Sequence, residues 1–98
     1  MSEFLIYLLP LRAALLKGDL TPEEQTCIDA HFAYLSHLTD QGVVNFAGRT
    51  TRTDEGFGLV LLQAESEQAA QDIMSADPAV RSGLMRASLW PFRTAIRR

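Results

Sequence analysis

Two stretches of the chain are apolar at almost every position and lack the polar alternation of a half-exposed strand. They are EFLIYLL at residues 3–9 and FGLVLLQA at residues 57–64. Runs of this kind are typical of strands that are covered on both faces. The pattern therefore predicts two interior strands. The six apolar residues at 4–9 fall far short of the roughly 20 that a membrane-spanning helix requires.

Residues 21–42 carry the strongest helix signals in the chain. Thr21 is a favourable N-cap, Pro22 suits the first helical position, and a glutamate at position 24 completes a capping box. Gly42 supplies the left-handed residue that closes many helices. These signals predict a helix of about 30 Å, at about 1.5 Å per residue.

Residues 67–76 form a second predicted helix, with apolar side chains at helical spacing along one side. Ser66 precedes it as a suitable N-cap. Asp77 and Pro78 then predict a short turn that the aspartate caps, and Gly83 ends it.

Two further strands are predicted at residues 43–50 and 84–92, which are rich in β-branched and aromatic side chains. The polar segment 51–55 joins the first of them to the second apolar run as a hairpin. Pro91 near the end of the last strand favours an edge position or a bulge. The segment LRAALL at 11–16 allows either a short helical turn or a loop.

The order of these elements is strand, helix, strand, strand, helix, strand. It predicts an α+β, ferredoxin-like βαββαβ fold, with a four-stranded antiparallel sheet and the helices on one face. A chain of 98 residues has room for one modest core, so we expect a single domain over residues 1–98.

The second face of such a sheet needs a cover of its own. Two helices cover only one face, which leaves Leu5, Tyr7 and Leu9 or their alternates exposed, together with one side of residues 57–64. In so short a chain the expected cover is a second copy, giving a homodimer paired through the sheet faces.

Charge and composition indicate which classes of partner, and which cellular location, to expect. A net charge of −3 speaks against nucleic acid, because phosphate binding needs a basic surface. Cys27 is the only cysteine, so no internal disulfide can form and a reducing, cytoplasmic location is expected. The sequence has no secretory or membrane signal, and we expect no membrane partner.

The two histidines of the first predicted helix point to opposite sides. At about 100° per residue, His31 falls within the apolar arc and His37 falls among polar residues. One interpretation of His31 is a buried structural imidazole that is satisfied by a backbone carbonyl. Alternatively, it is a general base or acid in a pocket between helix and sheet, since imidazole suits proton transfer near neutral pH.

A histidine base works better when a carboxylate fixes its tautomer, and Asp77 is the candidate carboxylate. Its other role, as N-cap of the turn at Pro78, is compatible with this one because a carboxylate has two oxygens. One inward histidine without partners at ligand spacing does not predict a metal site.

Six short motifs follow one another in an order that resembles the YciI-like (YCII-related) family of the dimeric α+β barrel superfamily. Together they cover nearly the whole chain. They are LTPEE (20–24), AHFAYLSHL (30–38) with Gly42 after it, FAG (46–48), the glycine-led apolar run 56–62, ADPAVRSGL (76–84) and WPF (90–92).

The resemblance implies a ferredoxin-like fold that pairs through its sheets. It also implies that the helix histidine and the Asp-Pro aspartate face one cleft as a catalytic pair, here His31 and Asp77. Most of the family has no assigned reaction, although lyase-type elimination on a small organic acid is among its known chemistries. The related muconolactone-isomerase barrels imply similar proton transfer, and no cofactor is implied.

The chain departs from the family at Arg49, where proline usually follows Ala-Gly. If this position borders the cleft, the arginine supplies a fixed positive charge for a carboxylate substrate. Alternatively, it points outward and pairs with Asp54 or Glu55. Gly48 and Tyr34 are the other candidate substrate-binding residues.

Two functions of different classes follow. In the first, the chain is an enzyme of lyase or isomerase type that uses His31 and Asp77 for proton transfer on a small organic acid or carbonyl compound. Its ligand is expected to be anionic. In the second, the chain is a non-catalytic dimeric ligand-binding or accessory module, and His31 is structural.

Overall fold

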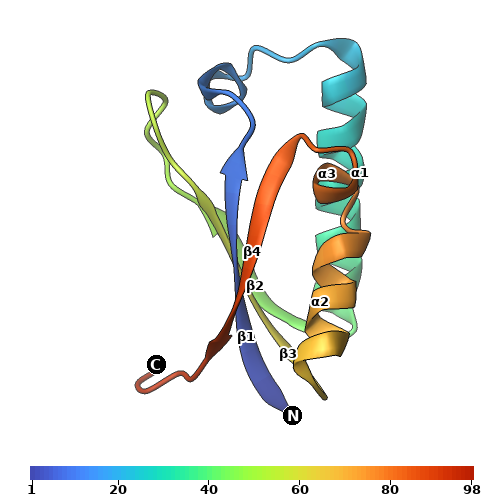
Figure 1. The fold of residues 1–98 in the computed structure, drawn as a ribbon. Helices are drawn as coiled ribbons and strands as arrows, with labels where there is room; N and C mark the ends of the chain where they lie inside the picture. The colour runs from blue at the N-terminus through green and yellow to red at the C-terminus, as the bar shows by residue number, and fades with distance from the viewer.

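The computed structural model describes residues 1–98 and has the predicted α+β architecture. Four antiparallel strands form one sheet in the order β2-β3-β1-β4. The three α-helices lie along a single face of it (Figure 1). In chain order the elements are β1 (Ser2–Pro10), the 3-10 helix η1 (Ala13–Lys17), α1 (Pro22–Asp40), β2 (Val44–Arg49), β3 (Gly58–Ala64), α2 (Glu67–Ala76), α3 (Pro78–Arg81) and β4 (Met85–Phe92).

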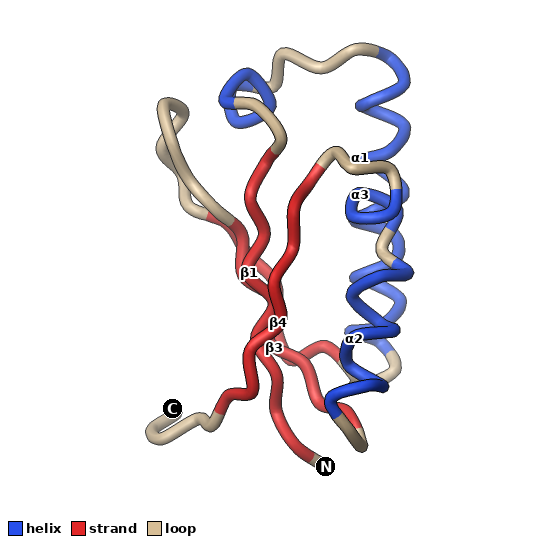
Figure 2. Tube along the Cα trace, in the orientation of Figure 1, coloured by secondary structure: helices blue, strands red, loops and turns tan.

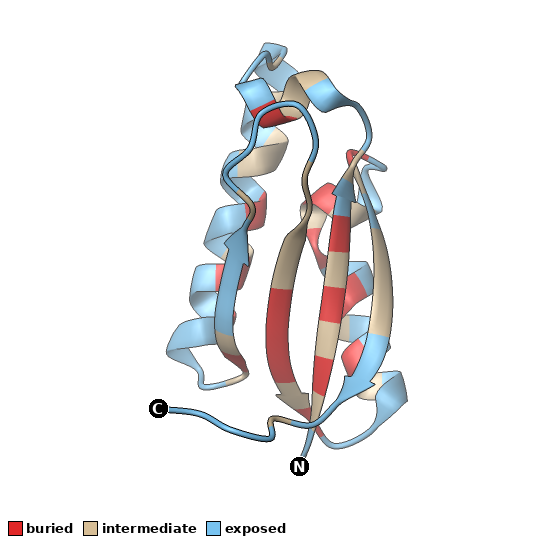
Figure 3. Ribbon diagram, turned by 90° about the vertical axis from the view of Figure 1, so that its left-hand side faces the viewer, coloured by how far each residue is buried: buried red, intermediate tan, exposed pale blue.

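The two doubly apolar runs are the interior strands β1 and β3, as predicted. They pair with each other in antiparallel register, with Ile6 opposite Val60 and Phe4 opposite Leu62. Directly opposed residues share a face of the sheet. Burial accordingly alternates along β1, as the bands in Figure 3 show.

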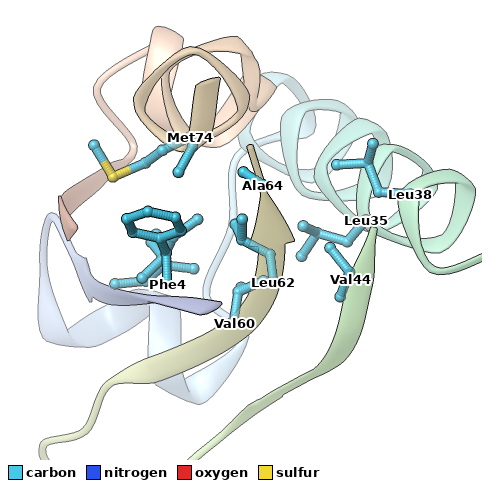
Figure 4. Packing of buried hydrophobic residues seen from close by; sticks show 11 residues of the cluster. Phe4, Leu35, Leu38, Val44, Val60, Leu62, Ala64 and Met74 are labelled. Atoms are coloured by element: carbon cyan, nitrogen blue, oxygen red, sulfur yellow. The ribbon is translucent and has the colours of Figure 1, made fainter. Parts of the chain in front are cut away.

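The hydrophobic core lies between the sheet and the helices. Leu62, at the centre of β3, has no exposed surface. In Figure 4 the side chains of the sheet and of helices α1 and α2 point into the same space. The core cluster consists of Phe4, Ile6, Leu8, Leu35, Leu38, Val44, Val60, Leu62, Ala64, Ala70 and Met74.

Helix α1 begins as its sequence predicts. The backbone N–H of Glu24 donates to Thr21 Oγ1 at 3.1 Å, and the N–H of Thr21 donates to Glu24 Oε1 at 2.9 Å. This reciprocal capping box satisfies two N–H groups that the first turn leaves unpaired. After the helix, Gly42 adopts the left-handed conformation with φ of 77°.

The segment whose structure the sequence left open forms the 3-10 helix η1. Leu16 is buried and anchors it, and Gly18 closes it in the left-handed conformation with φ of 81°. The guanidinium of Arg12 pairs with the carboxylate of Glu24, which connects this segment to the start of α1. Figure 2 shows the segment beyond the end of β1, on the way to α1.

Each edge strand has a feature of its own: β4 contains a proline, and β2 contains a register shift. β4 lies at one edge, as Pro91 suggested. β2 forms the other edge and contains a register shift between Val44 and Phe46. Val44 is opposite Leu62, but Phe46 is opposite Leu61, so the strand carries one extra residue at this point.

The face of the sheet opposite the helices, called here the open face, has no helix over it (Figures 1 and 2). Trp90 remains 58% exposed there and Phe46 50%. The strand registers place the following residues on this face: Leu5, Tyr7, Leu9, Phe46, Leu59, Leu61, Trp90 and Phe92. In the chain as a whole, none of the helices combines the length and the apolar character needed to traverse a bilayer.

Candidate functional site

The inward histidine is buried in the middle of α1. His31 is 4% exposed and His37 lies on the exposed side of the same helix, as the helical spacing predicts. The ring of Phe32 lies beside that of His31, with centroids 5.3 Å apart and planes tilted by 60°.

Asp77 lies at the junction between α2 and α3 and is also 4% exposed. Its Oδ1 accepts a hydrogen bond from the backbone N–H of Ala79 at 2.9 Å, so the predicted N-cap is present. A buried carboxylate is costly unless its oxygens receive hydrogen bonds. The position of Asp77 is therefore fixed by the start of α3.

The side chains of His31 and Asp77 meet although 46 residues separate them in the sequence. The Nδ1 atom of His31 lies 2.8 Å from each carboxylate oxygen of Asp77. An ionised carboxylate only accepts hydrogen bonds, so Nδ1 carries the proton and donates it. When the ring is neutral, its lone pair is therefore on Nε2.

Nε2 of His31 remains available for a ligand. The only hydrogen bonds of the ring are those from Nδ1, and no buried side-chain nitrogen or oxygen in the chain lacks a partner. Nε2 is therefore not sealed within the protein. In a general base of this kind, a carboxylate orients the ring through one nitrogen and the lone pair of the other nitrogen stays free.

His31 lines a cavity of about 770 Å³ between α1, η1 and the ends of β2 and β3. Asp77 is not part of the lining, so it stands behind His31 as seen from the cavity. A volume of this order suits a small organic ligand, for which pockets of about 300–1,000 Å³ are usual. Most of the lining residues are apolar, among them Leu16 and Phe32.

Arg49 and Gly48 lie in the same cavity lining as His31. Arg49 is opposite Gly58 in the sheet and therefore faces the helix side. The two acidic residues considered as outward partners of Arg49 are paired with another side chain: Arg52 pairs with both Asp54 and Glu55. The structure thus brings Arg49 to the cavity and does not pair it with the hairpin.

Tyr34 does not lie in that lining. Its hydroxyl donates to the backbone carbonyl of Ile73 at 2.8 Å, which connects α1 to α2. Burial raises the pKa of the Tyr34 phenol, and the negative charge of Asp77 raises it further. Because its hydroxyl is engaged in the core, we do not retain Tyr34 as a substrate contact.

The comparisons with known proteins concern the family and the fold of the chain. The family model described as the YCII-related domain matches residues 3–93. The chain belongs to the YCII-related family. Among curated proteins the comparison found no match.

This YCII-related domain also has a fold in common with a solved enzyme structure. It is the 5-chloro-2-hydroxyhydroquinone dehydrochlorinase from Burkholderia phenoliruptrix AC1100, in complex with 2,5-dihydroxybenzoquinone. The two chains superpose with a TM-score of 0.68 and are 23% identical, over 93% of each chain. At this identity the likeness establishes the fold.

Two polar groups of the YCII-related domain, one in the cavity lining and one outside it, were not predicted from the sequence. Lys17 of η1 lines the cavity together with Arg49. Ser82 Oγ lies 3.1 Å from the Sγ atom of Cys27, one turn before His31 on α1. Neither position carries a motif, and the one available signal was that Lys17 is the only lysine in the chain.

No group of three or more His, Cys, Asp or Glu side chains is placed to hold a metal ion.

Proposed function

We propose that this YCII-related domain is a small-molecule enzyme of lyase or isomerase type. It transfers a proton on a small organic acid or carbonyl compound. The observation that carries the proposal is the buried pair in which both oxygens of Asp77 lie 2.8 Å from His31 Nδ1, while Nε2 is left for the cavity.

In the proposed reaction, Nε2 of His31 removes a proton from a carbon next to a carbonyl group. The C–H bond breaks, an N–H bond forms, and the electron pair moves to the carbonyl oxygen as an enolate. The ring becomes an imidazolium, which the carboxylate of Asp77 stabilises. Asp77 keeps its own charge and acts by orienting and stabilising the ring.

Arg49 is the proposed anchor for the acidic group of the substrate. Its guanidinium is always charged and can donate two parallel hydrogen bonds to a carboxylate. Gly48, beside it in the lining, is opposite Leu59 and therefore borders the cavity through its backbone. Together these residues hold the reacting carbon near His31.

Two outcomes are available to the enolate. It can expel a leaving group from the neighbouring carbon, which completes an elimination, and the imidazolium then gives its proton to solvent or to the leaving group. An enolate that is conjugated with a further C=C bond can instead take the proton from the imidazolium at the far carbon of that bond, and the shift of the double bond completes an isomerisation. The likeness to a dehydrochlorinase, an enzyme of the elimination class by its name, favours the first outcome.

The test is deuterium exchange, which needs no knowledge of the product. A panel of small 2-oxo acids and enolisable lactones is incubated in D2O, and loss of the C–H signal is followed by NMR. We expect the wild type to accelerate exchange for at least one compound and His31→Ala to abolish the acceleration. His37→Ala, an exposed histidine on the same helix, is the matched control and should behave as wild type.

The rival function, a non-catalytic ligand-binding module with a structural His31, makes the opposite forecast. There the wild type binds acids in the cavity but accelerates no exchange, and His31→Ala lowers stability only. That result, obtained with a correctly folded wild type, would replace the enzyme by the binding module.

We also propose that two copies pair through the open face. This face presents a continuous apolar surface on β1 and β3, extended by Phe46 at one edge and Trp90 at the other. Monomeric proteins rarely leave a contiguous apolar patch of this kind uncovered. A second copy covers it with the same residues through a two-fold axis.

A further inference from the structure

The charged groups around the cavity are all of one sign. Lys17 from η1 and Arg49 from β2 are its only Lys or Arg residues. None of the 12 Asp and Glu residues of the chain lies in the lining, although they outnumber the 9 Lys and Arg residues overall. The cavity is therefore a positive region in an acidic protein.

Neither cation has a partner within the protein. The ion pairs of Lys or Arg involve only Arg12 and Arg52, and no side-chain hydrogen bond involves Lys17 or Arg49. Both side chains are exposed, whereas His31 is buried. The two cations thus stand at the rim of the cavity and the base lies at its floor.

Lys17 is held on an ordered wall and does not extend from a free loop. The preceding residue, Leu16, is buried in the same cavity lining. The backbone N–H of Gly18 donates to the carbonyl of Leu15 at 3.3 Å, and that of Asp19 donates to Ala14 at 3.1 Å. Lys17 and Arg49 therefore belong to separate walls, one formed by η1 and the other by the end of β2.

We propose that the ligand of this cavity is an organic dianion, with one acidic group at Arg49, the other at Lys17 and an apolar body between them. The apolar body would lie against the side chains of Ile28 and Phe32 of α1, which line the same cavity. This inference rests on the proposed function only for the choice of the cavity. It adds Lys17 as a specificity-determining residue, which selects diacids over monoacids.

Because Lys17 is the only lysine, it can be observed alone. Reductive methylation with 13C-formaldehyde labels one side chain and the terminal amine, and the spectrum of Lys17→Gln identifies which signal belongs to Lys17. Two matched pairs of probes are then titrated: succinate against butanoate, and terephthalate against 4-methylbenzoate. Within each pair the frame is constant and only the second carboxylate differs.

We expect a dicarboxylate to shift the Lys17 signal and to bind more tightly than its monocarboxylate partner, by about tenfold or more for one added charged hydrogen bond. Lys17→Gln should remove this advantage and leave the monocarboxylate affinity unchanged, and Lys17→Arg should restore it. Arg98→Gln makes the same change in net charge at the opposite end of the molecule and should have no effect (Figure 1).

The proposal is overturned if neither dicarboxylate binds more tightly than its partner, or if Lys17→Gln weakens both members of a pair equally. These readouts measure binding and require no turnover. If dianions are selected but no deuterium exchange is accelerated, the enzyme is refuted and this inference stands. If exchange is accelerated but Lys17→Gln leaves the preference for dicarboxylates unchanged, the enzyme stands and this inference is refuted.

Discussion

At the scale of single residues, one carboxylate serves two purposes. Asp77 accepts from the backbone of Ala79, which starts α3, and from His31 Nδ1, which fixes the ring of the base. Asparagine is a good N-cap but carries no charge. Alanine neither caps a helix nor carries a charge. The two roles can therefore be separated by two substitutions at the same position.

We predict that Asp77→Asn keeps α3 capped and loses the function of the base. In the wild type, 15N spectra of the ring should show a protonated Nδ1 and an unprotonated Nε2 for neutral His31. Asp77→Asn should weaken this tautomer preference and slow deuterium exchange by about 100-fold or more, since an oriented base contributes at least that much. Asp77→Ala should in addition be less stable by about 1 kcal/mol, measured by urea unfolding, because the cap is lost. An unchanged tautomer in Asp77→Asn would contradict the role given to the carboxylate.

Sequence reasoning reached the members of this pair but not their contact. Helical spacing predicted an inward His31, and the Asp-Pro dipeptide predicted a capping Asp77, because both are local properties. Their meeting across 46 residues depends on how α3 packs against α1, which no local pattern contains. Before the structure, the pairing was a hypothesis from the chemistry of a histidine base, and the family resemblance implied it as well. Tyr34 was also a candidate substrate-binding residue, yet its hydroxyl donates to the carbonyl of Ile73.

At the scale of the elements, the start of α1 was predictable in detail because a capping box depends on only four consecutive residues. The structure adds Arg12, which pairs with Glu24 from the η1 segment. The η1 segment itself was not predictable. Its helical form depends on the burial of Leu16 against the rest of the protein, and its flanking breakers are equally typical of a loop.

The capping box predicts a pH dependence. The hydrogen bond from the Thr21 N–H lowers the pKa of Glu24 below its ordinary 4.5, against a smaller opposing effect of desolvation, and the charge of Arg12 lowers it further. A carboxyl whose pKa is lower in the folded state stabilises the fold above its unfolded pKa and loses this effect as pH falls through the folded value.

We therefore expect Glu24→Gln to be less stable than the wild type at neutral pH, and the difference to disappear as the pH falls below about 4.5. Urea unfolding at a series of pH values measures it. Glu23→Gln is the matched control, because Glu23 lies in the same first turn and its side chain makes no hydrogen bond or ion pair. A constant difference at all pH values would show that the charge of Glu24 is not involved.

The β2–β3 hairpin offers a second prediction. A Cβ atom at Gly56 would lie 2.1 Å from Thr50 Oγ1, which accepts a hydrogen bond from the N–H of Phe57 at 3.0 Å. Gly56→Ala must displace this threonine and should lower the free energy of unfolding by about 1–3 kcal/mol. Thermal melts measure the loss of stability. At Gly48, in the same hairpin, a Cβ meets nothing within 4 Å, so Gly48→Ala should melt nearly as the wild type does. Equal effects of the two substitutions would exclude the contact with Thr50 as the cause.

At the scale of the whole molecule, the sheet has two unlike faces. One is buried under the helices, and the open face carries apolar side chains from all four strands. The continuous apolar runs of β1 and β3 predicted this from the sequence, since a strand with one wet face would alternate. What covers the open face is not a property of one chain, and it stays a proposal.

We predict that Trp90→Glu converts the proposed dimer into a monomer. Trp90 is 58% exposed on the open face, and a charge there would be buried without a partner in the dimer. Sedimentation equilibrium measures the mass directly. Ile96→Glu, at a 93% exposed position beyond the end of β4, introduces the same charge and should remain dimeric. A wild type that sediments as a monomer at all concentrations would refute the pairing.

The single extra residue in β2 decides which of its side chains belong to which surface. Val44 shares the face of Leu62, yet after the shift Phe46 faces outward with Leu61, and Arg49 faces inward with Gly58. Strict alternation from Val44 would have exchanged the last two. Deleting Asn45 would thus remove the bulge and make the alternation regular, with Phe46 still facing outward and Arg49 still facing inward. The extra residue therefore lets Val44 contribute to the core while Arg49 reaches the cavity, and a shorter β2 strand without it would keep the same side chain at the ligand.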